Sequence, residues 1–322
     1  MLTRKLGAAL AAGCTTVTKP AEQTPLGALA LAAIAHEVGV PAGVVNVVPA
    51  LDGARAGNRL VSAPAIRKIG FTGSTEVGKL LLRGAADDLK RISLELGGNA
   101  PFVVLGDADI DAAVAGAMIA KFRNTGQSCV AANRFIVEQP VAAAFTEKLT
   151  AAIAKLAVGS GLVAGIDLGP VIDDEAARKC ARLVSDATAR GARILFGAAP
   201  TGTSRLVAPV VLGGVTPDMA IWREEIFGPI VAIRAAKDEA DAIAQANDTD
   251  AGLVGYVFTR DGARQTRVAE ALQVGMVGVN EGLVSTAQAP FGGIKQSGVG
   301  REGSRHGIDD YTHLKYIATR VG

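Results

Sequence analysis

Cys129 stands where a cysteine could act as a nucleophile. It follows the polar, glycine-containing segment Phe122–Ser128, whereas Cys180 lies in the expected helix Glu175–Arg190, whose apolar residues recur at helical spacing, as is usual around a structural thiol. A nucleophilic cysteine needs thiolate character and access to its substrate. The residues alone leave two interpretations open, a reactive thiol and an ordinary one.

Glu95 is the second residue that could take part in covalent chemistry. It lies near the end of the apolar segment Arg91–Leu96, which we expect to be a strand. A carboxylate in this place is either a paired structural charge or a general base at the carboxyl edge of a sheet. Both interpretations remain open at this point.

A third feature is a glycine-containing turn, residues 72–75, between an expected strand at Ile66–Phe71 and a helix around Val77–Arg83. Backbone N–H groups at the start of a helix suit a phosphate, although an ordinary turn would have the same sequence. The turn approaches the P-loop pattern, but Leu80 stands where a hydroxyl would hold magnesium, so we exclude an NTPase.

Strands and helices alternate along the chain, which favours an α/β fold with doubly wound parallel sheets. Gly298, Gly300 and Gly303 spell a dinucleotide pattern, but no strand precedes them, so we interpret the match as accidental. The expected strands are Cys14–Thr18, Val44–Val48, Ile66–Phe71, Arg91–Leu96, Pro101–Leu105, Phe135–Val137, Ile194–Phe196, Ile230–Ile233, Val254–Phe258, Met276–Val279 and an edge strand at Tyr311–Ala318. The expected helices are Leu26–Val38, Val77–Arg83, Ile110–Lys121, Val141–Leu156, Glu175–Arg190 and Arg264–Leu272.

The composition of the 322 residues is that of a globular protein, with 49% hydrophobic residues and a formal net charge of +2. This charge gives no reason to expect nucleic acid or a membrane surface as partner. Three cysteines without metal-ligand spacing predict neither a disulfide framework nor a metal site, and favour the cytoplasm. The segment Met1–Cys14 is either a secretory signal or an amphipathic helix, and the α/β pattern that follows without a linker favours the helix.

Six segments together carry a resemblance that covers essentially the whole chain. The chain resembles the aldehyde dehydrogenase superfamily, most closely its succinate-semialdehyde dehydrogenases. The segments are Lys19–Glu22, Phe71–Gly78, Leu94–Pro101, Phe122–Cys129, Glu224–Pro229 and Pro290–Gly298, in the order of the family.

The resemblance implies a catalytic role for two residues and coenzyme contacts for others. Cys129 would attack the aldehyde carbon, and Glu95 would activate the water that hydrolyses the thioester. Because the Glu22 carboxylate would repel a 2′-phosphate, we expect NAD as coenzyme, with NADP possible. The residues implied in coenzyme binding are Lys19 and Glu22 at the adenosine ribose, Gly73 and Ser74 at the pyrophosphate, and Leu96, Glu225 and Phe227 at the nicotinamide end.

The resemblance also implies a substrate, succinate semialdehyde, which would be oxidised to succinate. Arg4, Arg123 and Ser285 fall on the positions that hold the distal carboxylate in succinate-semialdehyde members. Arginine suits bidentate recognition of a carboxylate, although both arginines could instead be structural ion-pair partners. Glutarate semialdehyde is an alternative, since one methylene is worth only about 1–3 kcal/mol.

The implied fold has two Rossmann-like doubly wound domains. We expect an NAD-binding domain at 1–96 that lacks its N-terminal part, a catalytic domain at 97–288, and a C-terminal return segment at 289–322 that ends in an oligomerisation strand of a homodimer or homotetramer. The chain departs from the family in two ways. Ala131 stands where many members have a second cysteine, so no local disulfide with Cys129 is expected.

The second departure is at Met1, just after the place where the family has a Trp-Asn motif whose Asn stabilises the oxyanion. Loss of one such hydrogen-bond donor typically lowers kcat about 10²–10³-fold. Two hypotheses follow, a working dehydrogenase and a shortened, non-catalytic remnant of one.

Overall fold

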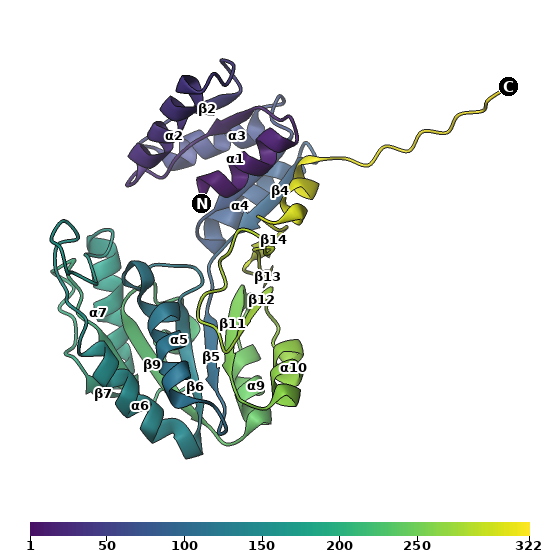
Figure 1. Cartoon of the computed structure of the whole chain (residues 1–322). Coiled ribbons are helices and arrows are strands. Elements are labelled where there is room, and N and C mark those ends of the chain that lie inside the picture. Colours follow the sequence, from purple (N-terminus) through teal and green to yellow (C-terminus); the bar gives the residue numbers. More distant parts are fainter. The chain divides into compact units, whose positions relative to one another are not determined.

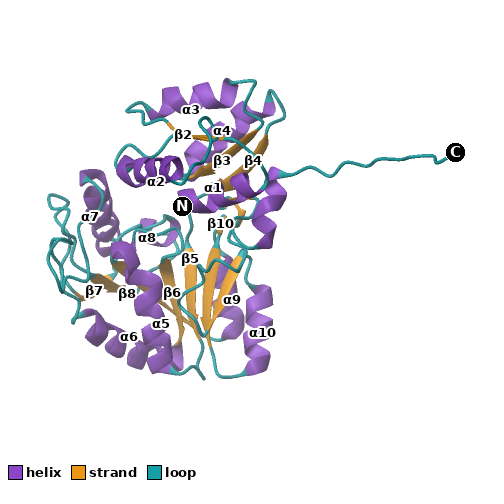
Figure 2. Cartoon of the chain, turned by 45° about the horizontal axis from the view of Figure 1, so that its top comes forward, coloured by secondary structure: helices purple, strands orange, loops and turns teal.

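The computed structural model describes all 322 residues, Met1–Gly322, which divide into two compact units (Figure 1). The first unit contains Met1–Glu95, Thr286–Gly292 and Gly298–Gly322, and the second contains Leu96–Ser285 and Gly293–Ser297. Both combine helices with parallel strand pairs, so the α/β class predicted from the alternation of elements is confirmed (Figure 2). No helix has the length and apolar character that crossing a bilayer would require.

The first unit has two small sheets. Strands β1 and β2 form a parallel pair, and the second sheet has the order β14-β4-β3, with β3 parallel and β14 antiparallel to β4. The elements are α1 (Leu2–Ala11), β1 (Thr16–Thr18), α2 (Pro25–Glu37), β2 (Val45–Val47), α3 (Gly53–Ser62), β3 (Lys68–Thr72), α4 (Thr75–Ala86), β4 (Arg91–Glu95), β14 (Gly298–Val299) and the 3₁₀ helix η2 (Arg305–Tyr311).

Local sequence signals explain the helices of this unit. The helix expected at the start of the chain is present as α1, with Ala9 buried. Helix α2 starts at Pro25, which takes the first helical position, where its missing N–H is not needed. Apolar residues lie on all sides of α2, and Leu26, Ile34 and Val38 are exposed. The first unit therefore presents apolar surface along this helix.

The second unit is built on a seven-stranded sheet of order β12-β11-β5-β6-β9-β8-β7, parallel except for β7. Its elements are β5 (Ala100–Val104), α5 (Ile110–Phe122), the 3₁₀ turn η1 (Arg123–Gly126), β6 (Ala132–Glu138), α6 (Gln139–Ile153), α7 (Asp174–Ala189), β7 (Arg193–Phe196), β8 (Val210–Gly213), α8 (Ala220–Arg223), β9 (Ile230–Ala236), α9 (Glu239–Asn247), β10 (Ala251–Gly252), β11 (Val254–Phe258), α10 (Gly262–Ala271), β12 (Met276–Val279) and β13 (Ile294–Lys295).

The alternation of side chains along the central strands builds a core on each face of this sheet. On one face the Phe102 ring lies 5.0 Å from Phe135, 4.9 Å from Phe258 and 6.3 Å from Phe145 of α6. On the other face Val103 and Ile136 belong to a buried cluster with residues of α7, α9 and α10, so helices cover both faces (Figure 1). The central strands are therefore buried on both sides and hold the loops at their ends in fixed positions.

The C-terminal segment differs from the prediction. Tyr311 ends η2, and residues 312–322 form neither helix nor strand (Figure 2). The edge strand expected at Tyr311–Ala318 is therefore not formed within the chain. Tyr316 and Ile317 favour extended backbone. A strand also needs a hydrogen-bonded neighbour, and no other strand of the chain pairs with this segment.

Candidate active site

Glu95 is the last residue of β4, and only 2% of its surface is exposed. Burial, together with the nearby charge of Glu302, raises the pKa of the Glu95 carboxyl group to about 8, although Lys5, Arg301 and Arg4 act in the opposite direction. A carboxyl group with this pKa is largely protonated at neutral pH and can exchange a proton just above it. These properties suit a general base at the carboxyl end of a strand.

An ion pair between Lys5 and Glu302 lies near Glu95, and the sequence analysis did not predict it. The Lys5 ammonium lies 2.5 Å from the Glu302 carboxylate and also donates to the Thr72 hydroxyl at 2.6 Å. Both charged side chains are mostly buried, at 17% and 6% exposure. The two residues are 297 positions apart, and no local pattern around either one indicates the other as its partner.

The glycine-rich segment that spells the dinucleotide pattern serves the Glu95 site. Gly298 pairs with Glu95 across β14 and β4, and a Cβ at Gly298 would lie 1.9 Å from the Leu94 carbonyl oxygen. A Cβ at Gly292 would lie 3.0 Å from Glu95 Oε1. Glycine therefore allows the backbone to approach Leu94 and the buried Glu95 carboxyl group closely. The interpretation of the dinucleotide match as accidental stays a prediction.

Lys19 and Glu22 lie together after β1. The Lys19 ammonium is 2.7 Å from Glu22 Oε1, and this hydrogen bond lowers the pKa of the Glu22 carboxyl group. A Cβ at Gly53 would lie 2.3 Å from the same oxygen, so a side chain at residue 53 would displace the Glu22 carboxylate from this position. A cavity of about 140 Å³ adjoins the pair; it is lined by Pro20, Ala21, Glu22, Pro25, Pro49, Ala50 and Leu51. A charged carboxylate thus borders a small cavity of the first unit.

Gly73 and Ser74 form the turn that begins α4. The Ser74 hydroxyl accepts a hydrogen bond from Val77 N at 3.3 Å, and the Gly73 N–H donates to the Glu95 carbonyl at 3.1 Å. Both turn residues are exposed at the N-terminus of a 12-residue helix. Its first N–H groups and its dipole suit a phosphate, as the sequence analysis expected.

In the second unit, Cys129 follows a left-handed turn. Asn124, Thr125 and Gly126 have φ angles of 52°, 58° and 77°, and the side chains of Asn124 and Gln127 each donate to the other's carbonyl, at 3.0 and 3.2 Å. Cys129 is half-buried and forms no disulfide. The turn follows the end of α5, and Cys129 therefore lies just before the amino end of β6.

Two contacts fix the backbone next to the thiol. The Tyr256 hydroxyl donates to the Val130 carbonyl at 2.7 Å, and a Cβ at Gly98 would lie 2.4 Å from the Cys129 carbonyl oxygen. Burial is the main cause of the raised pKa of the Tyr256 phenol, which therefore stays a donor at neutral pH. Sequence spacing gave no signal for either contact.

Glu225 lies near the same loop, because its Oε1 accepts a hydrogen bond of 2.9 Å from Gly98 N. Lys121 of α5 is fully buried, and burial lowers the pKa of its ammonium to about 7, although Cys180 and Glu225 act in the opposite direction. Phe227, two residues after Glu225, has a left-handed backbone conformation with a φ of 54°. The implied nicotinamide-end residue Leu96 is buried as well.

The residues expected at the substrate carboxylate lie in both units. Arg4 of the first unit has its guanidinium 3.9 Å from the centre of the Phe291 ring. Arg123 is exposed at the start of η1, and Ser285 is half-buried at the end of the long segment of the second unit. Their role in substrate binding stays a prediction.

The carboxyl ends of the central strands in the second unit, where α/β sheets commonly bind ligands, are filled by an ion cluster. Arg264 of α10 binds Asp107 at 2.7 Å, Glu138 at 2.6 Å and Glu239 at 2.7 Å. Asp107 follows β5 and Glu138 ends β6, so the guanidinium lies at the carboxyl ends of these two strands. Cys129 lies at the opposite side of the sheet, just before the amino end of β6.

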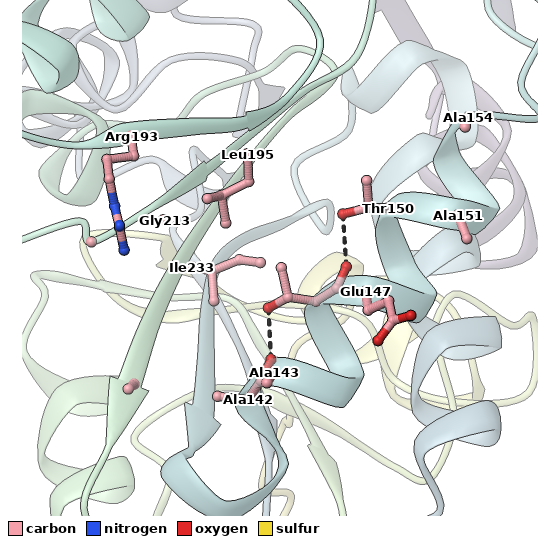
Figure 3. A pocket seen from close by; sticks show the side chains of 13 residues that line it. Ala142, Ala143, Glu147, Thr150, Ala151, Ala154, Arg193, Leu195, Gly213 and Ile233 are labelled. Atoms are coloured by element: carbon pink, nitrogen blue, oxygen red, sulfur yellow. Dashed lines mark hydrogen bonds between the residues drawn. The ribbon is translucent and has the colours of Figure 1, made fainter.

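One cavity of the second unit is lined by none of the predicted site residues. It is a groove of about 670 Å³ between α6 and the strands β7, β8 and β9 (Figure 3). Glu147 and Arg193 are its charged residues, and the Thr150 hydroxyl donates within α6 to Thr146 O at 2.7 Å. Its lining is otherwise alanine, glycine, threonine and branched aliphatic residues, which offer no catalytic group.

The chain is similar in sequence to characterised dehydrogenases. It is 52% identical over 318 residues to the succinate-semialdehyde dehydrogenase [NADP(+)] of Escherichia coli, covering 98% of this chain and 66% of that protein. It is equally 52% identical, with the same coverage, to the glutarate-semialdehyde dehydrogenase of Pseudomonas aeruginosa. The chain thus spans slightly less than two thirds of the length of these relatives.

Solved structures agree with this similarity. The succinate-semialdehyde dehydrogenase of Burkholderia pseudomallei superposes with a TM-score of 0.96 at 50% identity, over 98% of this chain and 66% of that one. An NADP-dependent enzyme of E. coli superposes equally well, at 52% identity and the same coverage. The model of the aldehyde dehydrogenase family matches residues 1–317. The chain belongs to the aldehyde dehydrogenase family.

Proposed function

We propose that this chain carries the catalytic residues of an NAD(P)-dependent dehydrogenase that oxidises succinate semialdehyde to succinate. The observation that carries the proposal is Glu95, a buried carboxyl group whose pKa of about 8 suits a base that activates water. The relatives named for semialdehyde oxidation, at 50–52% identity, support the choice of reaction.

The reaction divides into two steps on the chain's own residues. The Cys129 thiolate adds to the aldehyde carbon, and the adduct loses a hydride and becomes a thioester. Glu95 then takes a proton from water, whose oxygen attacks the thioester carbon; the acid departs and the Cys129 sulfur is regenerated. A nicotinamide coenzyme, when bound, supplies the acceptor of the hydride.

The first unit has residues that fit such a coenzyme. Lys19 and Glu22 would hold the adenosine ribose beside the small cavity, and Gly73 and Ser74 would hold the pyrophosphate at the start of α4. At the other end, Leu96, Glu225 and Phe227 would hold the nicotinamide and its ribose.

We infer that NAD is preferred over NADP. The hydrogen bond from Lys19 keeps Glu22 ionised at neutral pH, and its negative charge would oppose a 2′-phosphate. Two relatives are named for NADP, so the preference is a property proposed for this chain.

For the substrate, we propose that Arg123, Arg4 and Ser285 bind the distal carboxylate. Glutarate semialdehyde is the second candidate, because relatives of similar identity are named for it. We further propose that the enzyme works as a homo-oligomer in which Tyr311–Ala318 gains its strand partner from a second copy. Three cysteines outside any disulfide fit the reducing cytoplasm.

The proposal is tested by the reduction of NAD and NADP by the purified chain. Succinate and glutarate semialdehydes are compared with butanal, which lacks the distal carboxylate, and Cys129→Ala is the control. We expect turnover with both semialdehydes, slower turnover with butanal, and none in the control. A folded chain that reduces neither coenzyme with any of these aldehydes would contradict the proposal and would favour a non-catalytic remnant.

A further inference from the structure

A buried amide side chain lies at the crossing of three segments of the second unit. Asn99 is 4% exposed, and its Nδ2 donates to the carbonyl groups of Trp222 at 3.0 Å and Arg223 at 3.4 Å. Its Oδ1 accepts from Nδ2 of Asn133, which is 1% exposed, at 3.2 Å. Every polar atom of the Asn99 amide thus has a partner, as a buried amide requires.

The partners of Asn99 are themselves fixed. Asn133 Nδ2 also lies 3.5 Å from Glu224 O, so the two amides together bind the backbone of residues 222–224. The Asn99 carbonyl accepts from Arg134 Nε at 3.1 Å, and that buried guanidinium also binds the carbonyls of Gln245 and Ala246. The position of Asn99 is therefore set from strand β6 and from the end of α9.

The residues directly next to this network are those proposed to act in the reaction. Gly98 precedes Asn99, and its N–H donates to Glu225 Oε1 at 2.9 Å. Gly98 also packs closely against the carbonyl group of Cys129, the proposed nucleophile. Residues 222–224 lead directly into Glu225. Asn99 thus fixes the backbone on both sides of the Gly98–Glu225 hydrogen bond.

We propose that Asn99 is a positioning residue that holds the Glu225 carboxylate in place, by fixing Gly98 through the main chain and residues 222–224 through its side-chain amide. An apolar side chain of the same size would fill the space without the desolvation cost of an amide. The amide instead fixes the relative position of two segments, because its donors bind the backbone of residues 222–223 and its acceptor binds Asn133. The consequence for the reaction rests on the proposed function, in which Glu225 holds the coenzyme.

The first test measures the Gly98–Glu225 hydrogen bond without any coenzyme. Hydrogen–deuterium exchange of the Gly98 amide is compared in the wild type, Asn99→Leu and Asn46→Leu. Asn46 is the control, because its amide also bridges two backbone carbonyls, Thr16 O and Gly43 O, and shares no partner with Asn99 or Glu225. We expect exchange to be at least about tenfold faster in Asn99→Leu and unchanged in the control. Unchanged exchange in Asn99→Leu would overturn the inference.

The second test asks whether Asn99 acts through Glu225. We expect Asn99→Leu to raise the KM for NAD about tenfold with a smaller effect on kcat, and to have less than about a twofold effect when Glu225 is already alanine. An equal rise of KM in the Glu225→Ala background would contradict the inference. If Asn99→Leu does not fold, Asn99→Asp replaces it, since it keeps the acceptor for Asn133 and loses the donor to Trp222. A wild type without turnover refutes the proposed function, while the exchange of the Gly98 amide still decides the role of Asn99.

Discussion

Lys5 and Glu302 form a buried ion pair, with 2.5 Å between Nζ and Oε1, within electrostatic range of the Glu95 carboxyl group. The pair joins the first helix of the chain to the segment after β14. Glu302 raises the pKa of Glu95 and Lys5 lowers it, so the protonation of the proposed base depends on both.

The first prediction concerns the pH dependence that follows from Glu95. Its folded pKa of about 8 lies above the ordinary value of 4.5, so the folded chain holds a proton that the unfolded chain loses between these values. The stabilisation is fully present below pH 4.5 and is lost as the pH rises through 8. The rate of thioester hydrolysis, which needs ionised Glu95, should rise as the pH increases through about 8. Glu95→Gln should abolish hydrolysis and should be more stable than the wild type at pH 9, as measured by urea unfolding; equal stabilities there would contradict the burial argument.

The second prediction concerns Lys121. Its pKa of about 7 lies below the ordinary 10.5, so between these values the unfolded chain binds a proton that the folded chain does not. This residue therefore makes stability rise with pH over that window. Lys121→Met should remove this rise, measured as the difference from the wild type in unfolding free energy at pH 7 and 9.5. Lys148→Met, at an exposed ion pair, is the control and should leave the slope unchanged.

The third prediction concerns coenzyme choice. Glu22→Gln keeps the size of the side chain and removes its charge, so the repulsion of a 2′-phosphate is lost. We expect kcat/KM for NADP to rise at least about tenfold, with a small change for NAD. Glu37→Gln, at an exposed residue of α2, is the control. An unchanged ratio of the two coenzymes in Glu22→Gln would show that Glu22 does not set the preference.

The fourth prediction concerns the ion cluster that fills the carboxyl ends of the second sheet. Arg264→Met leaves Asp107, Glu138 and Glu239 without their shared cation. Because Arg264 is only 19% exposed, we expect a loss of about 2 kcal/mol in unfolding free energy. Arg205→Met, at an exposed pair with Asp174, should have a much smaller effect. Equal losses of unfolding free energy in the two variants would show that the Arg264 cluster contributes no more to stability than an exposed ion pair does.

The parts of the fold and the site that depend on neighbouring residues could be predicted from the sequence. The start of α4 after Ser74 and the turn before Cys129 could be predicted, because turn chemistry and strand pattern are local. The Lys5–Glu302 pair could not be found, since nothing near Lys5 marks a partner 297 residues away. The amide network of Asn99 was missed for the same reason.

The predicted strand at Tyr311–Ala318 shows a different limit of sequence reasoning. Tyr316 and Ile317 are of the residue types that favour extended backbone, and both are exposed. A strand forms only where another strand offers hydrogen bonds, and that partner is not encoded in the segment itself.

The most direct test of the account is to trap the thioester. Glu95→Gln, mixed with NAD and succinate semialdehyde, should release one equivalent of NADH per chain and then stop, because water is not activated. Peptide mass spectrometry should find a succinyl group on Cys129 and none on Cys14 or Cys180. A full burst with Cys129 unmodified, or continued turnover in this variant, would contradict the assignment of Cys129 as the nucleophile and Glu95 as the base.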